Sequence, residues 1–126
     1  MSDKIMRLGI LGCGRVCDHY IDKILKKNNI ASLFKVVACC DVDIKKSSRV
    51  AKLLNCKSFQ TIGEFLSNED MDMILILTKS GQHFEHAKIC LENNFNILVE
   101  KPLALRVEHA NELLELSKVK NKFCIL

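Results

Sequence analysis

The chain has 126 residues, of which 48% are apolar and 27% charged, values typical of one folded domain rather than a disordered segment. The net charge of +4 comes from scattered lysines, and with 6% aromatic residues and no tryptophan there is no stacking platform for single-stranded nucleic acid, so nucleic-acid binding is not expected. No apolar run is long enough to span a bilayer and no signal peptide is evident, so we expect a cytoplasmic protein without membrane contact.

Short apolar runs alternate with amphipathic segments along the whole chain. In order, the pattern predicts a strand at residues 5–11, a helix at 15–27, a strand at 34–40, a helix capped by Asp43, a short edge strand at 57–60, a short helix at 62–66, a strand at 71–78, a helix at 82–91, a strand at 96–99, a helix at 107–119 and a strand at 122–126. Alternating strands and helices imply parallel pairing with right-handed crossovers. The expected fold is α/β: a Rossmann-type, doubly wound and mainly parallel sheet in three αβα layers.

The apolar positions within these segments indicate the buried faces. Residues 74–77 are consecutively apolar, as a central strand covered by helices on both sides requires. Helical spacing predicts three buried stripes: Val50, Ala51 and Leu54; His83, Ala87, Cys90 and Leu91; and Val107, Ala110, Leu113 and Leu114.

The chain contains seven cysteines, Cys13, Cys17, Cys39, Cys40, Cys56, Cys90 and Cys124. No two of them form a C-x-x-C pair, so the spacing typical of zinc sites and of thioredoxin-like redox sites is missing. Most lie at apolar strand or helix positions, where a thiol acts as a small hydrophobic group, and we interpret them as reduced cysteines.

A glycine-containing turn follows the first strand, in the segment Gly12, Cys13, Gly14, Arg15 and Val16. The first glycine permits a tight strand-to-helix turn, and the second removes the Cβ that would collide with a bound pyrophosphate. The amide groups that open the next helix would then face the phosphates. Cys17 stands where the dinucleotide motif usually has glycine or alanine, and methyltransferases that bind S-adenosylmethionine use a similar turn.

Asp41 ends the second strand, a little beyond the distance of about 20 residues expected for the acid that binds the adenosine ribose. A carboxylate there accepts both ribose hydroxyls and repels a 2′-phosphate, which favours NAD over NADP. Arg15 in the phosphate turn leaves NADP open, since it could hold the extra phosphate. The alternative role of Asp41 is to cap the following helix, although Asp43 is better placed for that.

Together with these features, Thr78 followed by His83 and Ala87, and Glu100-Lys101-Pro102 after a later strand, resemble the glucose–fructose oxidoreductase, inositol dehydrogenase and rhizopine-catabolism family. The resemblance covers essentially the whole chain. It implies an N-terminal Rossmann domain followed by a substrate-binding α+β domain, and oxidation or reduction of secondary alcohols on sugars, cyclitols or nucleotide sugars with NAD or NADP.

The resemblance also implies roles for single residues. Lys101 would lie near the nicotinamide and the reacting hydroxyl, where an ammonium stabilises negative charge on the substrate oxygen; a solvated loop lysine is the alternative. Glu100 would orient the loop or the nicotinamide ribose. Pro102 would fix the backbone, either with a cis bond before it or as an ordinary helix-start proline.

Four further residues follow the central strand within the next few positions. Thr78 and Ser80 should line it, because a dinucleotide lies at the carboxyl ends of the strands. His83 matches the family's histidine at a helix start, with a cleft role and a packed role both open. Lys79 stands where the family more often has proline. His83 and His86 are three residues apart, but no third ligand is evident, so no metal site is expected.

The chain is short for the family. We expect residues 1–126 to form the dinucleotide-binding domain, with the C-terminal substrate domain absent and supplied, if at all, as a separate or excised partner. The leading interpretation is an NAD(P)-dependent oxidoreductase domain for a sugar-like small molecule, incomplete for turnover on its own. The alternative is a stand-alone dinucleotide-binding or sensing module without catalysis.

Overall fold

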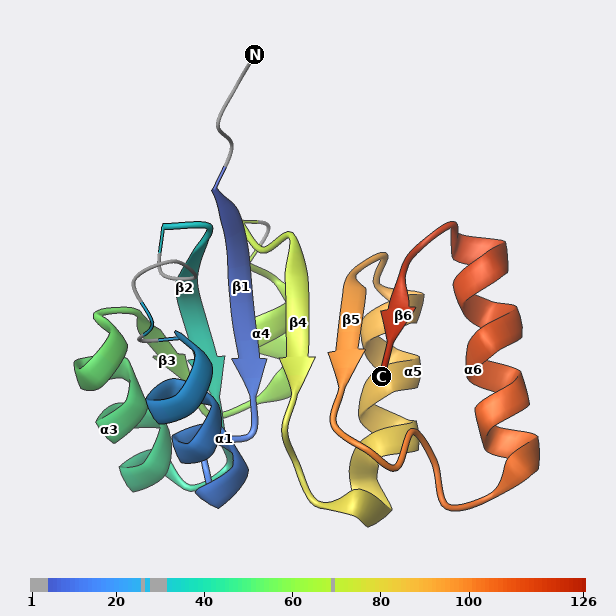
Figure 1. Cartoon of the computed structure of the whole chain (residues 1–126), viewed down its shortest axis with the longest axis horizontal. Coiled ribbons are helices and arrows are strands. Elements are labelled where there is room, and N and C mark those ends of the chain that lie inside the picture. Colours follow the sequence, from blue (N-terminus) through green and yellow to red (C-terminus); the bar gives the residue numbers. More distant parts are fainter. Residues whose placement is uncertain (1–4, 26, 28–31, 69) are drawn as a thin grey trace.

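The computed structural model describes residues 5–25, 27, 32–68 and 70–126. Six parallel strands form one sheet in the order β3-β2-β1-β4-β5-β6 (Figure 1). The strands are β1 (Met6–Leu11), β2 (Phe34–Cys40), β3 (Lys57–Phe59), β4 (Met73–Ile76), β5 (Asn96–Val99) and β6 (Cys124–Ile125). This strand order is that of a doubly wound dinucleotide-binding sheet, so the expected fold is confirmed.

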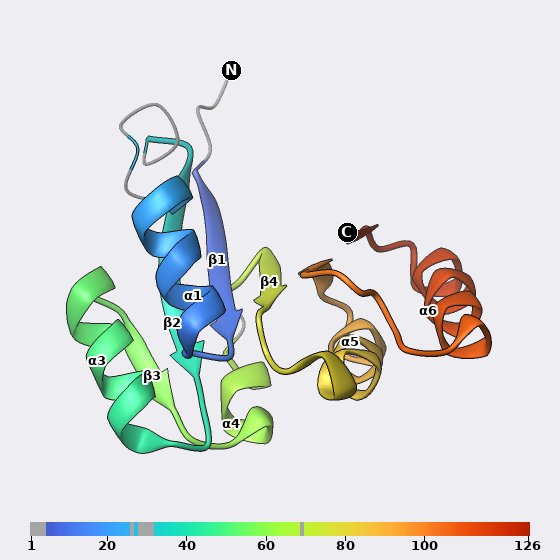
Figure 2. The same ribbon diagram turned by 60° about the horizontal axis from the view of Figure 1, so that its bottom comes forward.

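Helices cover the two faces of the sheet. They are α1 (Arg15–Tyr20), which continues as the π-helical η1 (Ile21–Leu25), then α3 (Ile44–Leu54), α4 (Ile62–Leu66), the 3₁₀ turn η2 (Ser80–Gln82), α5 (His83–Glu92) and α6 (Val107–Lys120). α1 and α3 lie on one face, and α4 and α5 lie on the other, as the two views in Figures 1 and 2 show. No helix within the described ranges is long and apolar enough to cross a membrane.

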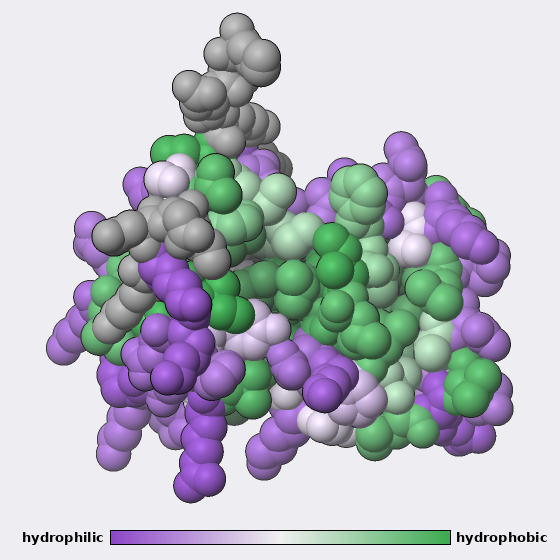
Figure 3. Space-filling view, in the orientation of Figure 1, coloured by the Kyte–Doolittle hydropathy of each residue, from purple (hydrophilic) through white to green (hydrophobic). Residues whose placement is uncertain are grey.

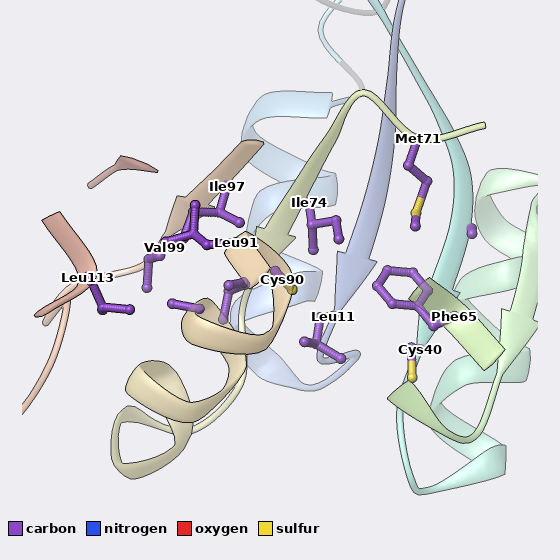
Figure 4. Packing of buried hydrophobic residues seen from close by; sticks show 13 residues of the cluster. Leu11, Cys40, Phe65, Met71, Ile74, Cys90, Leu91, Ile97, Val99 and Leu113 are labelled. Carbon is purple, nitrogen blue, oxygen red and sulfur yellow. The ribbon is translucent and has the colours of Figure 1, made fainter. Parts of the chain in front are cut away.

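Side chains of the central strands point alternately into two apolar clusters. In β4, Ile74 and Ile76 pack with Phe65 and Leu91 on the α4–α5 face (Figure 4). Met73 and Leu75 belong to the other cluster, under α1 and α3. The consecutive apolar run is therefore buried on both sides, as predicted for a central strand.

The predicted helical stripes are correct for α5 and partly wrong for α6. All four expected residues of α5 are buried. In α6, Leu113 is fully buried, but Val107 is 73% exposed and Leu114 44% exposed. α6 lies at the edge of the sheet and packs mainly against α5, so only a narrow stripe of it meets the core.

Three predicted boundaries also change. The helix expected to run to residue 27 is described as far as Leu25, its second half is π-helical, and residue 27 is not helical; residue 26 lies outside the described residues. The strand expected at residues 71–78 is limited to Met73–Ile76, and the strand expected at 122–126 to Cys124–Ile125. Both shorten because ladder pairing with their neighbours stops at these residues.

Candidate functional site

A hollow of about 550 Å³ opens at the carboxyl ends of β1, β2 and β4. Strand order reverses here, since β1 leads to β2 on one side while β4 pairs with β1 on the other, and such switch points hold the ligands of open α/β sheets. Its volume lies within the range of small-molecule sites. It is lined by Leu11, Gly12, Gly14, Arg15, Val16, Cys40, Asp41, Val42, Asp43, Lys46, Ile62, Leu77, Thr78, Lys79, Gln82 and His86.

Gly12 makes the turn between β1 and α1, and the protein itself requires glycine there. Its φ of +103° lies in the region that side chains rarely adopt. An added Cβ would also lie 2.7 Å from the carbonyl carbon of Leu77 and 2.8 Å from the backbone nitrogen of Thr78. The turn is closed by a 2.9 Å hydrogen bond from the Gly12 N–H to the Cys40 carbonyl.

Gly14 is different, because nothing in the protein excludes a side chain there. A Cβ at this position would meet no atom within 4 Å and would project from the wall of the hollow. Gly14 is the N-cap of α1 and provides no side-chain cap, so no side chain covers the first amide groups of the helix. The residues present therefore fit a diphosphate, because Gly14 leaves space for it and no side chain caps the first amide N–H groups of α1.

Asp41 joins the phosphate turn to the end of β2. Its carboxylate accepts hydrogen bonds from the backbone N–H of Cys13 and from that of Asp43, both 2.9 Å long. Asp43, not Asp41, is the N-cap of α3, since its side chain accepts from the Lys45 N–H at 3.0 Å. Each carboxylate oxygen of Asp41 retains further acceptor capacity toward the hollow, which is what two ribose hydroxyls need.

The predicted residues fall into two groups. Gly12, Gly14, Arg15, Val16, Asp41 and Thr78 line the hollow; Cys13, Ser80, His83, Glu100, Lys101 and Pro102 do not. The Cys13 side chain points into the core, and only its amide faces Asp41. Ser80 lies exposed in η2.

His83 is buried and ties two loops together. One ring nitrogen lies 2.8 Å from the Thr78 carbonyl oxygen and the other 2.6 Å from the Pro102 carbonyl oxygen. It thus joins the segment after β4, where Thr78 lines the hollow, to the loop after β5.

The loop after β5 carries Glu100, Lys101 and Pro102 beside the hollow. Lys101 is exposed, and the bond between it and Pro102 is cis. The Tyr20 hydroxyl donates a 2.7 Å hydrogen bond to the Glu100 carboxylate. Burial and this carboxylate raise the pKa of Tyr20 to about 12. Glu100 is therefore anchored to the end of α1, the helix that opens at Gly14.

Lys46, Gln82 and His86 are polar residues of the hollow that the sequence analysis did not place near it, and Asp43 lines it in addition to capping α3. His86 Nδ1 lies 2.9 Å from the Thr78 hydroxyl, and burial lowers the pKa of this histidine. Helical spacing could have found it, because a stripe that buries His83 and Ala87 turns His86 toward the strand end that carries Thr78.

Sheet order, turn and hollow together define a dinucleotide-binding Rossmann domain. Residues 6–126 match the family model described as "Oxidoreductase family, NAD-binding Rossmann fold". The chain belongs to this family, the glucose–fructose oxidoreductase, inositol dehydrogenase and rhizopine-catabolism family that the sequence resembles.

Two curated relatives match more than nine-tenths of this chain. The chain is 25% identical over 116 residues to a UDP-N-acetylglucosamine 3-dehydrogenase of Acidithiobacillus ferrooxidans, covering 92% of this chain and 34% of that protein. It is 23% identical over 117 residues to inositol 2-dehydrogenase 3 of Saccharopolyspora erythraea, covering 93% and 34%. The chain thus spans about a third of the length of these relatives.

Solved structures agree on the fold. The WlbA dehydrogenase of Chromobacterium violaceum, crystallised with NADH and UDP-GlcNAcA, superposes with a TM-score of 0.91 at 23% identity, over 98% of this chain and 35% of that one. Myo-inositol 2-dehydrogenase of Lactobacillus plantarum gives 0.83 at 22% identity, over 97% and 36%.

Proposed function

We propose that this chain is the cofactor-binding part of an oxidoreductase that acts on a secondary alcohol of a sugar, cyclitol or nucleotide sugar, and that NAD is its preferred cofactor. The observation that supports the proposal is the hollow at the switch point of the sheet. It is lined by Gly14, which leaves space for a ligand, and by Asp41, whose carboxylate is held by the Cys13 N–H. The curated relatives, a nucleotide-sugar dehydrogenase and an inositol dehydrogenase, support this substrate class.

In this proposal the phosphate turn binds the diphosphate through the amides that follow Gly14. Asp41 accepts the hydroxyls of the adenosine ribose, and its negative charge disfavours a 2′-phosphate. Arg15 and Lys46 also line the hollow, and their positive charges would favour NADP instead. We assign the preference to NAD because Asp41 is fixed by two backbone donors at the place where the ribose would lie.

The loop after β5 would position the reacting end. A bound nicotinamide cofactor would supply hydride exchange with the alcohol carbon. Lys101 would donate a hydrogen bond to the substrate oxygen and stabilise its negative charge. Glu100 holds its loop against Tyr20, and His83 holds it against the end of β4, so both act as positioning residues for Lys101.

Substrate binding is proposed to need a further domain or partner chain. In Figure 3 an apolar surface extends over β5 and β6, on the face that no described helix covers in Figure 1. Ile125 is 43% exposed there. An apolar face of this kind is typical of a surface that another polypeptide covers. We place the protein in the cytoplasm, where its seven free thiols would remain reduced.

The alternative function is a dinucleotide-sensing module without catalysis. It would bind NADH through the same hollow but would not need Lys101. We expect the isolated chain to bind NADH and to oxidise sugars poorly, because groups that position the substrate are missing. Efficient sugar turnover by this chain alone would contradict that expectation.

The test is a fluorescence titration of wild type, Asp41→Ala and the control Asp70→Ala with NADH and with NADPH. Hydrogen bonds to a charged group contribute about 1.5–3 kcal/mol, so we expect Asp41→Ala to weaken NADH binding about 10- to 100-fold and to narrow the preference over NADPH. Asp70 is exposed beside Arg7, near the amino-terminal end of β1 and away from the hollow, and its replacement should change neither affinity. Equal NADH binding by wild type and Asp41→Ala would remove Asp41 from the site.

A further inference from the structure

Arg49 of α3 reaches the phosphate turn from outside the cofactor hollow, which it does not line. α3 lies beside α1 on the same face of the sheet (Figures 1 and 2). One terminal nitrogen of the guanidinium, Nη2, donates to the Asp18 carboxylate at 2.7 Å and to the Cys13 carbonyl oxygen at 3.4 Å. Asp18 is in the first turn of α1, so this nitrogen contacts both the phosphate turn and the start of the helix that follows it.

Cys13 is held in the phosphate turn from two other elements. Its N–H donates to the Asp41 carboxylate at 2.9 Å, and its carbonyl oxygen accepts from Arg49. Its side chain is buried, and the thiol lies 3.6 Å from the Cys40 carbonyl oxygen. These contacts fix the orientation of the peptide group that joins Cys13 to Gly14, with Arg49 as the group that holds its carbonyl.

The same peptide group carries the Gly14 N–H. The bond between Cys13 and Gly14 is trans, and in a trans peptide the C=O bond and the N–H bond point in opposite directions. A carbonyl turned toward Arg49 therefore turns the Gly14 N–H away from α3. Within the part of the chain that the structure describes, this N–H donates to no protein acceptor, and Gly14 itself lines the hollow.

We propose that Arg49 is a positioning residue for the cofactor diphosphate, because its hold on the Cys13 carbonyl directs the Gly14 N–H toward the phosphate oxygens. The inference rests on the proposed binding of a dinucleotide in the hollow. Arg49 makes no contact with the cofactor in this proposal. It fixes one of the amide donors at the start of α1 before the ligand arrives, and a donor that is already oriented costs less to order on binding.

The ion pair between Arg49 and Asp18 suits a positioning role better than a role in stability. The two side chains are 46% and 44% exposed. Exposed ion pairs contribute little to folding stability, because water screens them and both side chains lose freedom. The pair does fix the direction of the guanidinium, since the shorter of its two hydrogen bonds goes to Asp18.

The test compares Arg49→Ala with wild type and with the control Lys88→Ala, by NADH titration and thermal unfolding. Lys88 forms a 2.8 Å ion pair with Glu112 at similar exposure and does not line the hollow, so the control removes the same charge. Arg49→Ala should bind NADH about 3- to 10-fold more weakly, as expected for one hydrogen bond, with a Tm within about 5 °C of wild type. Lys88→Ala should keep wild-type affinity, and an equal loss in both variants would overturn the proposal.

Arg49→Lys separates the position of the guanidinium from its charge. Lysine keeps the positive charge but lacks the planar group that reaches both acceptors, so NADH binding should remain at least about 3-fold weaker than in wild type. Wild-type affinity in Arg49→Lys would show that charge alone acts and would overturn the proposal. Wild-type affinity in Arg49→Ala would do the same, whatever its Tm.

The Gly14 amide reports its own orientation by NMR. Labelling with [15N]glycine gives five backbone signals, because the chain contains five glycines, and Gly14→Ala identifies the signal of Gly14. This signal should move in Arg49→Ala and stay in place in Lys88→Ala. In wild type, ADP, which carries a diphosphate, should shift it further. An unmoved Gly14 signal in Arg49→Ala would overturn the proposal.

The proposed function can fail separately from this inference. A wild type that binds neither NADH nor ADP would contradict dinucleotide binding itself, and the role of Arg49 with it. A wild type that binds both, together with an Arg49→Ala variant that binds both equally well, would overturn the role of Arg49 and leave the proposed function standing.

Discussion

Replacing each glycine of the phosphate turn by alanine should separate folding from cofactor binding. At Gly12 the added methyl group meets the backbone at 2.7 Å and the residue must keep a φ of +103°. Positive φ alone costs about 1–3 kcal/mol, and the backbone contact adds to it, so we expect a loss of about 3 kcal/mol or more. At Gly14 the methyl group meets nothing and φ is negative, −92°, so the cost to folding should be only that of an alanine at a helix N-cap, about 1 kcal/mol or less.

Thermal unfolding and NADH titration of the same samples measure the two effects. In a domain of this size, about 1 kcal/mol corresponds to roughly 3–6 °C in Tm, so Gly12→Ala should unfold about 10 °C or more below wild type. Gly14→Ala should keep its Tm within a few degrees of wild type, yet bind NADH at least about 10-fold more weakly, a loss of about 1.4 kcal/mol. Wild-type NADH affinity in Gly14→Ala would show that the diphosphate does not lie against Gly14. Wild-type stability in Gly12→Ala would show that the backbone around Gly12 accommodates a side chain.

Three further predictions concern the residues around the hollow. Tyr20 is the chain's one tyrosine and there is no tryptophan, so its phenolate absorbance can be titrated directly. We expect a titration midpoint at about pH 12 in the folded chain and about pH 10 in urea, and a folded-state midpoint in Glu100→Gln that is lower than in wild type. The contribution of Tyr20 to the folding stability should be complete below pH 10 and lost as the pH rises toward 12. A midpoint at pH 10 in the folded chain would contradict the Tyr20–Glu100 contact. His83→Ala should lower the unfolding free energy by about 2–4 kcal/mol in denaturant titrations, because it leaves a cavity and removes the ring that lies between the carbonyl oxygens of Thr78 and Pro102. A loss no larger than that of the exposed His19→Ala would contradict the bridging role. Burial lowers the pKa of His86 below 6.5, so the unfolded chain binds this proton at a higher pH than the folded chain, and the folding stability should fall as pH drops below 6.5. His86→Asn should flatten this pH dependence of the stability. An unchanged slope would show that His86 is not desolvated.

The sheet could be predicted because its signals are local. The apolar run at residues 74–77, the glycine turn after the first strand and the cap at Asp43 each depend on neighbours within a few residues, and each is found where it was expected. Val107 and Leu114 were misjudged for a different reason. Helical spacing says which residues share a face, but not that α6 lies at the sheet edge, where much of that face meets solvent.

The site was harder to predict, because it depends on how separate loops meet. His83 matches a family position and was expected near the cleft, yet its ring is used to join Thr78 to Pro102. His86, three residues later, lines the hollow and contacts the Thr78 hydroxyl. Both residues lie in the first turn of α5, where helical spacing separates the buried ring of His83 from His86 on its flank, but spacing does not say which loops each ring meets.

A crystal of the chain soaked with NADH tests the central claim most directly. We expect the diphosphate to lie against the amides that follow Gly14, with the adenosine ribose hydroxyls within hydrogen-bond distance of the Asp41 carboxylate. Density for NADH elsewhere, or a hollow that stays empty at a concentration where the titration shows binding, would contradict it.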